Sequence, residues 1–195
     1  MNLTLALLFG FGSGAVHAVT APDHLLSIAP VVLRAPARAL PVGTAWGVGH
    51  ALGTLLLGLP LLLLAAVVDL ARFGPWGVRL AGLALLVTTA WSWQTSRRAV
   101  AVAVDTRAPF LVGLVHGVTG AAALLLMLPV LVSASLVASV GFLLTFAVGS
   151  TLGMVAFAWM VGRLGSNLAP RATDRLQAAT LVLAVLIAAA LLVFG

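Results

Sequence analysis

The sequence contains no cysteine, no tyrosine, no lysine and no glutamate, and only 7% of its 195 residues are charged. Without cysteine there is no disulfide framework, no thiolate metal site and no thiol–disulfide relay across a membrane. Without tyrosine, only the five tryptophans can supply an aromatic belt. Soluble proteins carry roughly 25% charged residues, so the shortage of charge argues against a soluble protein.

Apolar residues make up 63% of the chain. A membrane-spanning helix needs about 20 consecutive apolar residues. Six stretches of this sequence are long enough: 3–33, 41–68, 76–95, 109–132, 136–162 and 176–194. We therefore expect an all-α membrane protein with six transmembrane helices, surrounded by lipid, with short charged connectors and no soluble domain.

The charge of +6 comes from ten arginines and four aspartates, and most of the arginines lie between apolar stretches. This distribution is typical of loops and not of a nucleic-acid-binding surface, so no nucleic acid partner is expected. With the N-terminus outside, only Arg72 and Arg79 lie outside, and the inside holds the other eight: Arg34, Arg38, Arg97, Arg98, Arg107, Arg163, Arg171 and Arg175. The positive-inside rule then predicts both termini outside, in a bacterial-type cytoplasmic (inner) membrane.

The chain is an internal duplication. Residues 14–31 align without a gap on residues 113–130, and half of these positions are identical. Residues 48–53 align in the same way on residues 148–153. We expect one membrane domain built from repeat 1 (1–108, three helices and a connector) and repeat 2 (109–195, three helices). Because each repeat has an odd number of helices, the two should have inverted topology, with a site at their interface.

The first predicted helix, residues 3–33, is too long for the membrane. At 1.5 Å a residue it would span roughly 46 Å against a hydrocarbon core of about 30 Å. Pro22 removes a helical hydrogen bond and clashes with the preceding turn, so we expect the helix to break near Pro22. Gly-x-x-x-Gly pairs mark the first, second, fourth and fifth predicted helices, which should form the core.

Titratable side chains inside the apolar stretches identify a candidate metal site. Such groups are costly in a membrane and usually mark a site or a pathway. A straight helix would place His17 and His24 about 10 Å apart, too far to share an ion. A break at Pro22 would bring them together, with ligands from other helices. The predicted ligands are His17, Asp23, His24, His50 and His116, a set that suits nickel, cobalt, zinc or iron better than calcium or magnesium.

Weaker ligands are expected to line the cavity at Thr20, Thr119 and Ser150. Repeat 2 keeps His116 as the equivalent of His17, but has Ala122, Ala123 and Ser150 in place of Asp23, His24 and His50. We therefore expect one repeat to provide most of the binding.

The motif at residues 17–24, HAVTAPDH, followed by GVGH at residues 47–50, resembles the nickel/cobalt transporter superfamily, in particular its small six-helix UreH-like members. The resemblance implies that His17, Asp23 and His24 are metal ligands or their neighbours, and that His50 lines the same path. It also implies a secondary transporter whose transported ion is nickel or cobalt, with zinc or iron as alternatives and no permanently bound cofactor.

Two other functions fit the same architecture. A small-anion exporter of the sulfur oxyanion type would use half-helix N-termini exposed at the break. A redox protein would bind haem between histidines of different helices. No arrangement of serine, histidine and acid indicates hydrolysis, so we do not expect an enzyme. A homo-oligomer is compatible with the sequence.

Overall fold

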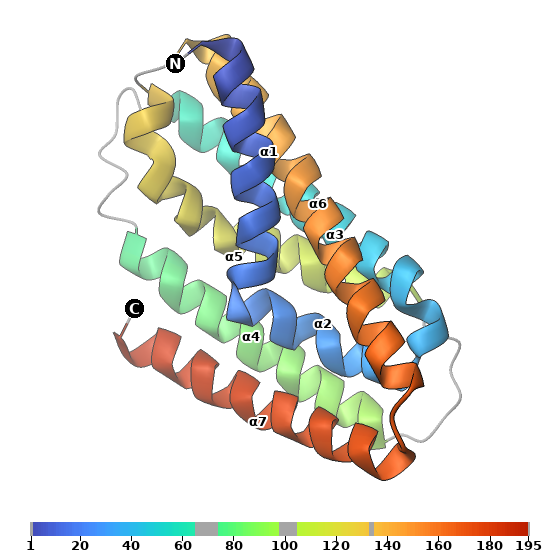
Figure 1. Cartoon of the computed structure of the whole chain (residues 1–195). Helices are drawn as coiled ribbons and strands as arrows, with labels where there is room; N and C mark the ends of the chain where they lie inside the picture. The colour runs from blue at the N-terminus through green and yellow to red at the C-terminus, as the bar shows by residue number, and fades with distance from the viewer. Residues whose placement is uncertain (1, 65–73, 98–104, 133–134, 195) are drawn as a thin grey trace.

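The computed structural model describes residues 2–64, 74–97, 105–132 and 135–194 (Figure 1). Within these ranges the chain is all-helical, with seven α-helices and one short 3-10 helix. The elements are α1 (Leu3–Thr20), α2 (Pro22–Arg34), η1 (Pro36–Arg38), α3 (Ala39–Leu64), α4 (Gly74–Arg97), α5 (Arg107–Val132), α6 (Leu136–Ser166) and α7 (Pro170–Phe194). Arg72 and Arg98, which entered the count of loop charges, lie outside the described residues.

The first predicted helix, residues 3–33, is two helices in the structure. This explains why the described residues form seven α-helices where the sequence predicted six. Helix α1 ends at Thr20, Ala21 adopts an extended conformation with φ −82° and ψ 107°, and α2 begins at Pro22. A proline is tolerated at the first position of a helix, where its missing N–H has no helical partner. The predicted break near Pro22 is therefore confirmed.

Four segments of the described residues are long and apolar enough to cross a membrane: Leu3–Thr20, Pro36–Leu64, Leu136–Ser166 and Pro170–Phe194. Large apolar side chains also point outward, including Leu8 and Leu56, which are 66% and 68% exposed. Exposed apolar surface on this scale is typical of a protein in contact with lipid. The number of spans and the inversion of the repeats stay predictions.

Two tight helix pairs form the core. Helix α1 packs along α6, α3 packs along α5, and α3 also packs against α6. These are the first, second, fourth and fifth predicted helices. Glycines make the close approach possible: a Cβ added at Gly14 would collide with the backbone carbonyl of Phe146, and one at Gly113 with that of Trp46.

The contacts of the two pairs correspond position by position. Gly14 and Gly113 are aligned in the duplication, and so are the residues they meet, Phe146 and Trp46. In the same way Gly49 lies against the carbonyl of Phe110 and Gly149 against that of Phe11. Each repeat therefore offers the other the same packing surface.

Helices α4 and α7 pack on each other at the side of this core. Leu85 of α4 forms an apolar cluster with Ala184 and Ala188 of α7 and with Leu26 of α2. This cluster attaches the short helix α2 to the third helix of each repeat. Helix α2 also packs on α6, where Ile28 and Val32 share an apolar cluster with Met154 and Ala158.

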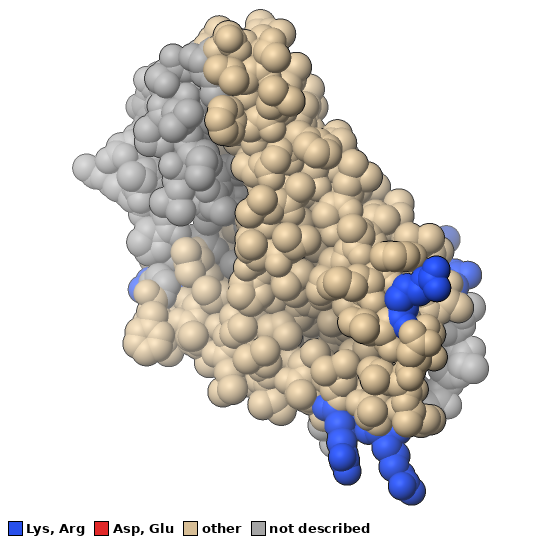
Figure 2. Space-filling model, viewed as in Figure 1, with Lys and Arg blue, Asp and Glu red and all other residues tan. Residues whose placement is uncertain are grey.

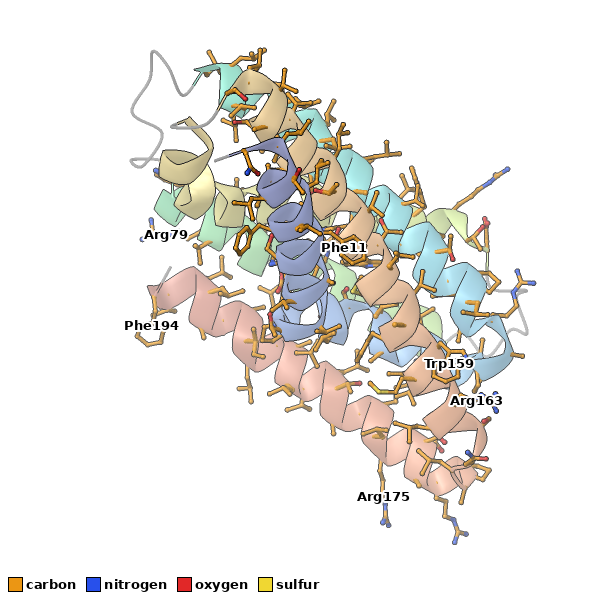
Figure 3. All side chains as sticks on the ribbon, turned by 45° about the horizontal axis from the view of Figure 1, so that its top comes forward. Phe11, Arg79, Trp159, Arg163, Arg175 and Phe194 are labelled. Carbon is orange, nitrogen blue, oxygen red and sulfur yellow. The ribbon has the colours of Figure 1, made fainter. Side chains whose placement is uncertain are left out.

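Most of the described arginines lie away from the chain ends, and Arg79 lies on the same side as the ends. In Figure 1 the N-terminus lies at the upper left and the C-terminus at the left edge, whereas most of the blue surface in Figure 2 lies along the lower and right edges, with a smaller part at the left edge. Figure 3 places Arg163 and Arg175 at the right and lower side and Arg79 at the far left. This distribution agrees with the charge asymmetry read from the sequence.

Candidate metal centre

Three imidazoles meet at the break between α1 and α2. His17 belongs to the last turn of α1, His24 to the first turns of α2 and His50 to the middle of α3. One potential ligand atom from each of the three lies within 4.8 Å of the other two. Ligands of one ion must lie within about 4 Å of each other, so a small rotation of the side chains would close the site.

The break accounts for this proximity. On a continuous helix the seven-residue separation of His17 and His24 corresponds to about 10 Å along the axis. The ring centroids are 4.8 Å apart instead. The ring of His50 lies 4.6 Å from that of His24 and 6.0 Å from that of His17.

Asp23 supplies the negative charge of the cluster. Its Oδ1 lies 3.3 Å from Nδ1 of His24, close enough for an ion pair but not aligned as a hydrogen bond. The carboxylate also occupies the first turn of α2, where it offsets the positive end of the helix dipole. His17 lies at the negative end of α1, so the broken ends together favour a cation.

The buried nitrogens of this cluster lack hydrogen bonds. Among the described residues, five buried side-chain polar atoms have no partner, and all five are ring nitrogens in or beside the cluster: Nδ1 and Nε2 of His24, Nδ1 of His50, Nε2 of His116 and Nε1 of Trp46. An unsatisfied buried polar group costs about 1–3 kcal/mol. A cation would satisfy the bare imidazole lone pairs. His17 is only partly buried and therefore marks the more open side of the cluster.

Two aromatic residues, which the sequence analysis did not identify, hold the imidazoles. Trp46 stacks on His50 with ring centroids 5.2 Å apart and 13° between the planes, and it meets the ring of His24 edge-on at the same distance. Phe146 of α6 lies 5.4 Å from the ring of His17. The only sequence signal for Trp46 is its position one helical turn before His50.

Thr54, one turn after His50, was also missed. Its hydroxyl lies 3.5 Å from Nε2 of His50 and 3.5 Å from the carbonyl oxygen of Gly117 on α5. In this arrangement Nε2 of His50 can donate to the hydroxyl, which donates in turn to the carbonyl. Nδ1 of His50 would then be the bare nitrogen that faces an ion, an orienting role typical of groups that surround metal ligands.

His116 lies beside the three-imidazole cluster and outside it. Its ring centroid is 5.9 Å from that of His24 and 5.7 Å from that of Trp46. Its Nδ1 is 3.0 Å from the carbonyl oxygen of Val112, one turn earlier on α5.

The three predicted cavity-lining hydroxyls are all used within their own helices. Thr20 is exposed and donates to the carbonyl of Val16, and Thr119 donates to the carbonyls of Val115 and His116. Ser150 is buried and donates to the carbonyl of Ala147. Since each hydroxyl already has a carbonyl partner, the structure gives none of them an obvious role as a ligand.

Comparison with known proteins finds two relatives and no matching family model. The Arabidopsis thaliana protein named chloroplast protein FOR GROWTH AND FERTILITY 2 is 30% identical over 205 residues, which cover 94% of this chain and 55% of that protein. Chloroplast protein FOR GROWTH AND FERTILITY 1, also from Arabidopsis thaliana, is 30% identical over 194 residues, or 86% of this chain and 53% of that protein. The chain spans about half the length of the curated relatives it matches. No solved structure matches.

Proposed function

We propose that this protein is a membrane transporter for a divalent transition-metal ion, with nickel or cobalt as the first candidates. His17, His24 and His50 would bind the ion through ring nitrogens, and Asp23 would balance its charge. Imidazoles with one carboxylate suit nickel, cobalt, zinc and iron(II). The observation that carries the proposal is the group of partnerless buried imidazole nitrogens at the helix break.

The duplicated core supports transport rather than simple storage of metal. The matched glycine contacts of α1 with α6 and of α3 with α5 fit the two inverted three-helix repeats expected from the sequence. Transporters of this kind bind substrate near the membrane midplane, at broken helices between the repeats. The relatives bear chloroplast names, so a plastid membrane is as compatible with the proposal as a bacterial inner membrane.

An anion exporter is less well supported. The N-terminus of α2 does lie beside the imidazoles, since His24 is the third residue of this helix, as that function would need. However, Asp23 lies in the first turn of α2 with its carboxylate beside His24, and it would repel an anion at that position.

Titration of the purified full chain with nickel, cobalt, zinc and magnesium tests the proposal. We expect binding of one nickel or cobalt ion per chain and no competition from magnesium, which prefers oxygen ligands. His50→Ala should weaken nickel binding by more than the 10–100-fold typical of changes around a metal site. Thr89→Val is the matched control, because Thr89 is a buried residue of α4 whose hydroxyl donates to the carbonyl of Leu85 in its own helix.

Two results would contradict the proposal. One is a wild-type protein that binds none of the transition metals or binds magnesium equally well. The other is a Soret band in the purified protein, which would indicate haem between the histidines instead.

A further inference from the structure

His116 presents a ligand atom that the three-imidazole cluster does not use. A carbonyl oxygen only accepts hydrogen bonds, so the contact with Val112 places the proton of the neutral ring on Nδ1. Nε2 is then left as a bare lone pair, and it is buried without a partner among the described residues. The ring is therefore already oriented as a metal ligand.

His116 also occupies the position in repeat 2 that His17 occupies in repeat 1. The two histidines are aligned in the duplication, and so are the aromatic residues beside them. The ring of His17 lies 5.4 Å from Phe146, and that of His116 lies 5.7 Å from Trp46. Each histidine thus comes from the first helix of one repeat and lies against the second helix of the other.

His24 neighbours both of the equivalent histidines. Its ring centroid is 4.8 Å from that of His17 and 5.9 Å from that of His116. It is almost completely buried, and both of its ring nitrogens lack hydrogen-bond partners among the described residues. No hydrogen bond of the ring opposes its rotation from one neighbour towards the other, and its 3.3 Å contact with the carboxylate of Asp23 would change in that rotation.

We propose that His24 keeps hold of the ion during transport while His17 and His116 replace each other as ligands. The inference rests on the proposed metal-transport function. In the state seen here the ion would bind His17, His24 and His50. In the alternate state the bond to the His17 nitrogen is broken and a bond to Nε2 of His116 is formed. Only ligands are exchanged, so no electron is transferred and the charge of the ion is unchanged.

This exchange explains why repeat 2 keeps one histidine although it lacks the others. A fourth simultaneous imidazole would hold the ion more tightly, whereas transport requires a site that the ion can leave. Two alternating ligands related by the duplication would instead let each repeat hold the ion in turn, as alternating access requires.

The test separates equilibrium binding from transport. Nickel affinity is measured by calorimetry on the purified full chain, and nickel uptake is measured in proteoliposomes. His17→Ala should weaken both, binding by at least about tenfold. His116→Ala should leave affinity within about threefold of the wild type and lower uptake by at least about tenfold, since it removes a ligand needed only in the alternate state. Thr89→Val should change neither.

A direct count of ligands gives a second readout. X-ray absorption of the nickel-loaded protein should show three imidazoles in the wild type and three in His116→Ala. Four imidazoles in the wild type, or a loss of affinity in His116→Ala equal to that in His17→Ala, would make His116 an ordinary ligand and overturn the exchange. Wild-type uptake by His116→Ala would also overturn it.

His116→Gln covers the case in which the alanine variant does not fold. This variant keeps a buried polar side chain, and its folding is checked by a single peak in size-exclusion chromatography. It should likewise keep its nickel affinity while its nickel uptake is lowered. If the wild-type protein binds no nickel, the proposed metal site itself is wrong, which is distinguishable from a failure of the exchange alone.

Discussion

Residues 14–31 and residues 113–130 began as the same sequence and now differ in backbone structure. The first stretch is divided between α1 and α2, whereas the second lies within the single helix α5. At the position of the break, repeat 1 has Pro22 and repeat 2 has Ala121. Proline ends a helix by removing a hydrogen bond, and alanine is the best helix former. The break at Pro22, together with the ligand residues that repeat 2 lacks, separates a repeat that can gather ligands from one that mainly supports it.

Packing between the repeats has stayed the same although the chemistry has not. The glycine contacts of α1 with α6 match those of α3 with α5. The comparison implies that substitutions at the break and among the ligands should affect one repeat, and that substitutions at the packing glycines should affect both alike.

The largest effect is expected from His24→Ala, which gives repeat 1 the alanine that repeat 2 has at position 123. The substitution removes the imidazole that lies closest to both His17 and His50. Nickel affinity should fall by more than about 100-fold and uptake should be lost, since even changes around the ligands lower affinity 10–100-fold. Calorimetry and proteoliposome uptake measure the two effects. Normal transport by this variant would place the site elsewhere.

Pro22→Ala should have the next largest effect. It gives repeat 1 the alanine that the unbroken helix α5 has at the aligned position, Ala121. A continuous helix would separate His17 and His24 by about 10 Å, so that both could not bind one ion. We expect nickel affinity to fall at least about tenfold while the protein remains folded and helical by circular dichroism. Unchanged affinity would show that tertiary contacts alone maintain the break.

Thr54→Val tests a smaller difference, since the aligned residue of repeat 2 is the buried, apolar Met154. Valine keeps the shape of threonine but cannot relay a hydrogen bond from His50 to Gly117. Nickel affinity should fall by about tenfold, the lower end for groups that orient ligands, because both contacts are long at 3.5 Å. Restoring threonine at position 54 should restore the nickel affinity. An unchanged affinity would mean that Trp46 stacking alone orients His50.

The smallest difference between repeats is expected at the packing glycines. A Cβ at Gly49 would collide with a carbonyl of α5, and one at Gly149 with the equivalent carbonyl of α1. Gly49→Ala and Gly149→Ala should each destabilise the protein by about 1–3 kcal/mol, the usual cost of overpacking, and by similar amounts. Thermal unfolding in detergent measures both. Tolerance of one substitution and not of the other would contradict equivalent packing.

The sequence was informative where local chemistry decides the structure. Pro22 predicted the break because proline removes a helical hydrogen bond and clashes with the preceding turn, although Pro30 and Pro60 lie within α2 and α3. Titratable His17, His24 and His50 stood out against an apolar background, and the structure brings them together.

It was less informative where the same type of residue has many roles. Trp46 is one aromatic residue among many apolar ones, and only the assembled fold shows that it stacks on His50. Helix ends were also missed: α7 begins at Pro170 and not near residue 176, because its first turns are polar yet helical. A hydropathy profile marks the part of a helix that lies in the membrane, and it does not show where the helix itself begins or ends.

The extended residue Ala21 also has a mechanical consequence. Helix α1 is clamped to α6 through Gly10 and Gly14, whereas α2 is attached through Leu26 to the separate pair α4 and α7. Helix α2 is also held by α6, because Ile28 and Val32 share an apolar cluster with Met154 and Ala158. It therefore bridges α6 and the α4–α7 pair. A shift of this pair relative to α6 would act on α2 from one side only and would change the distance between His17 and His24.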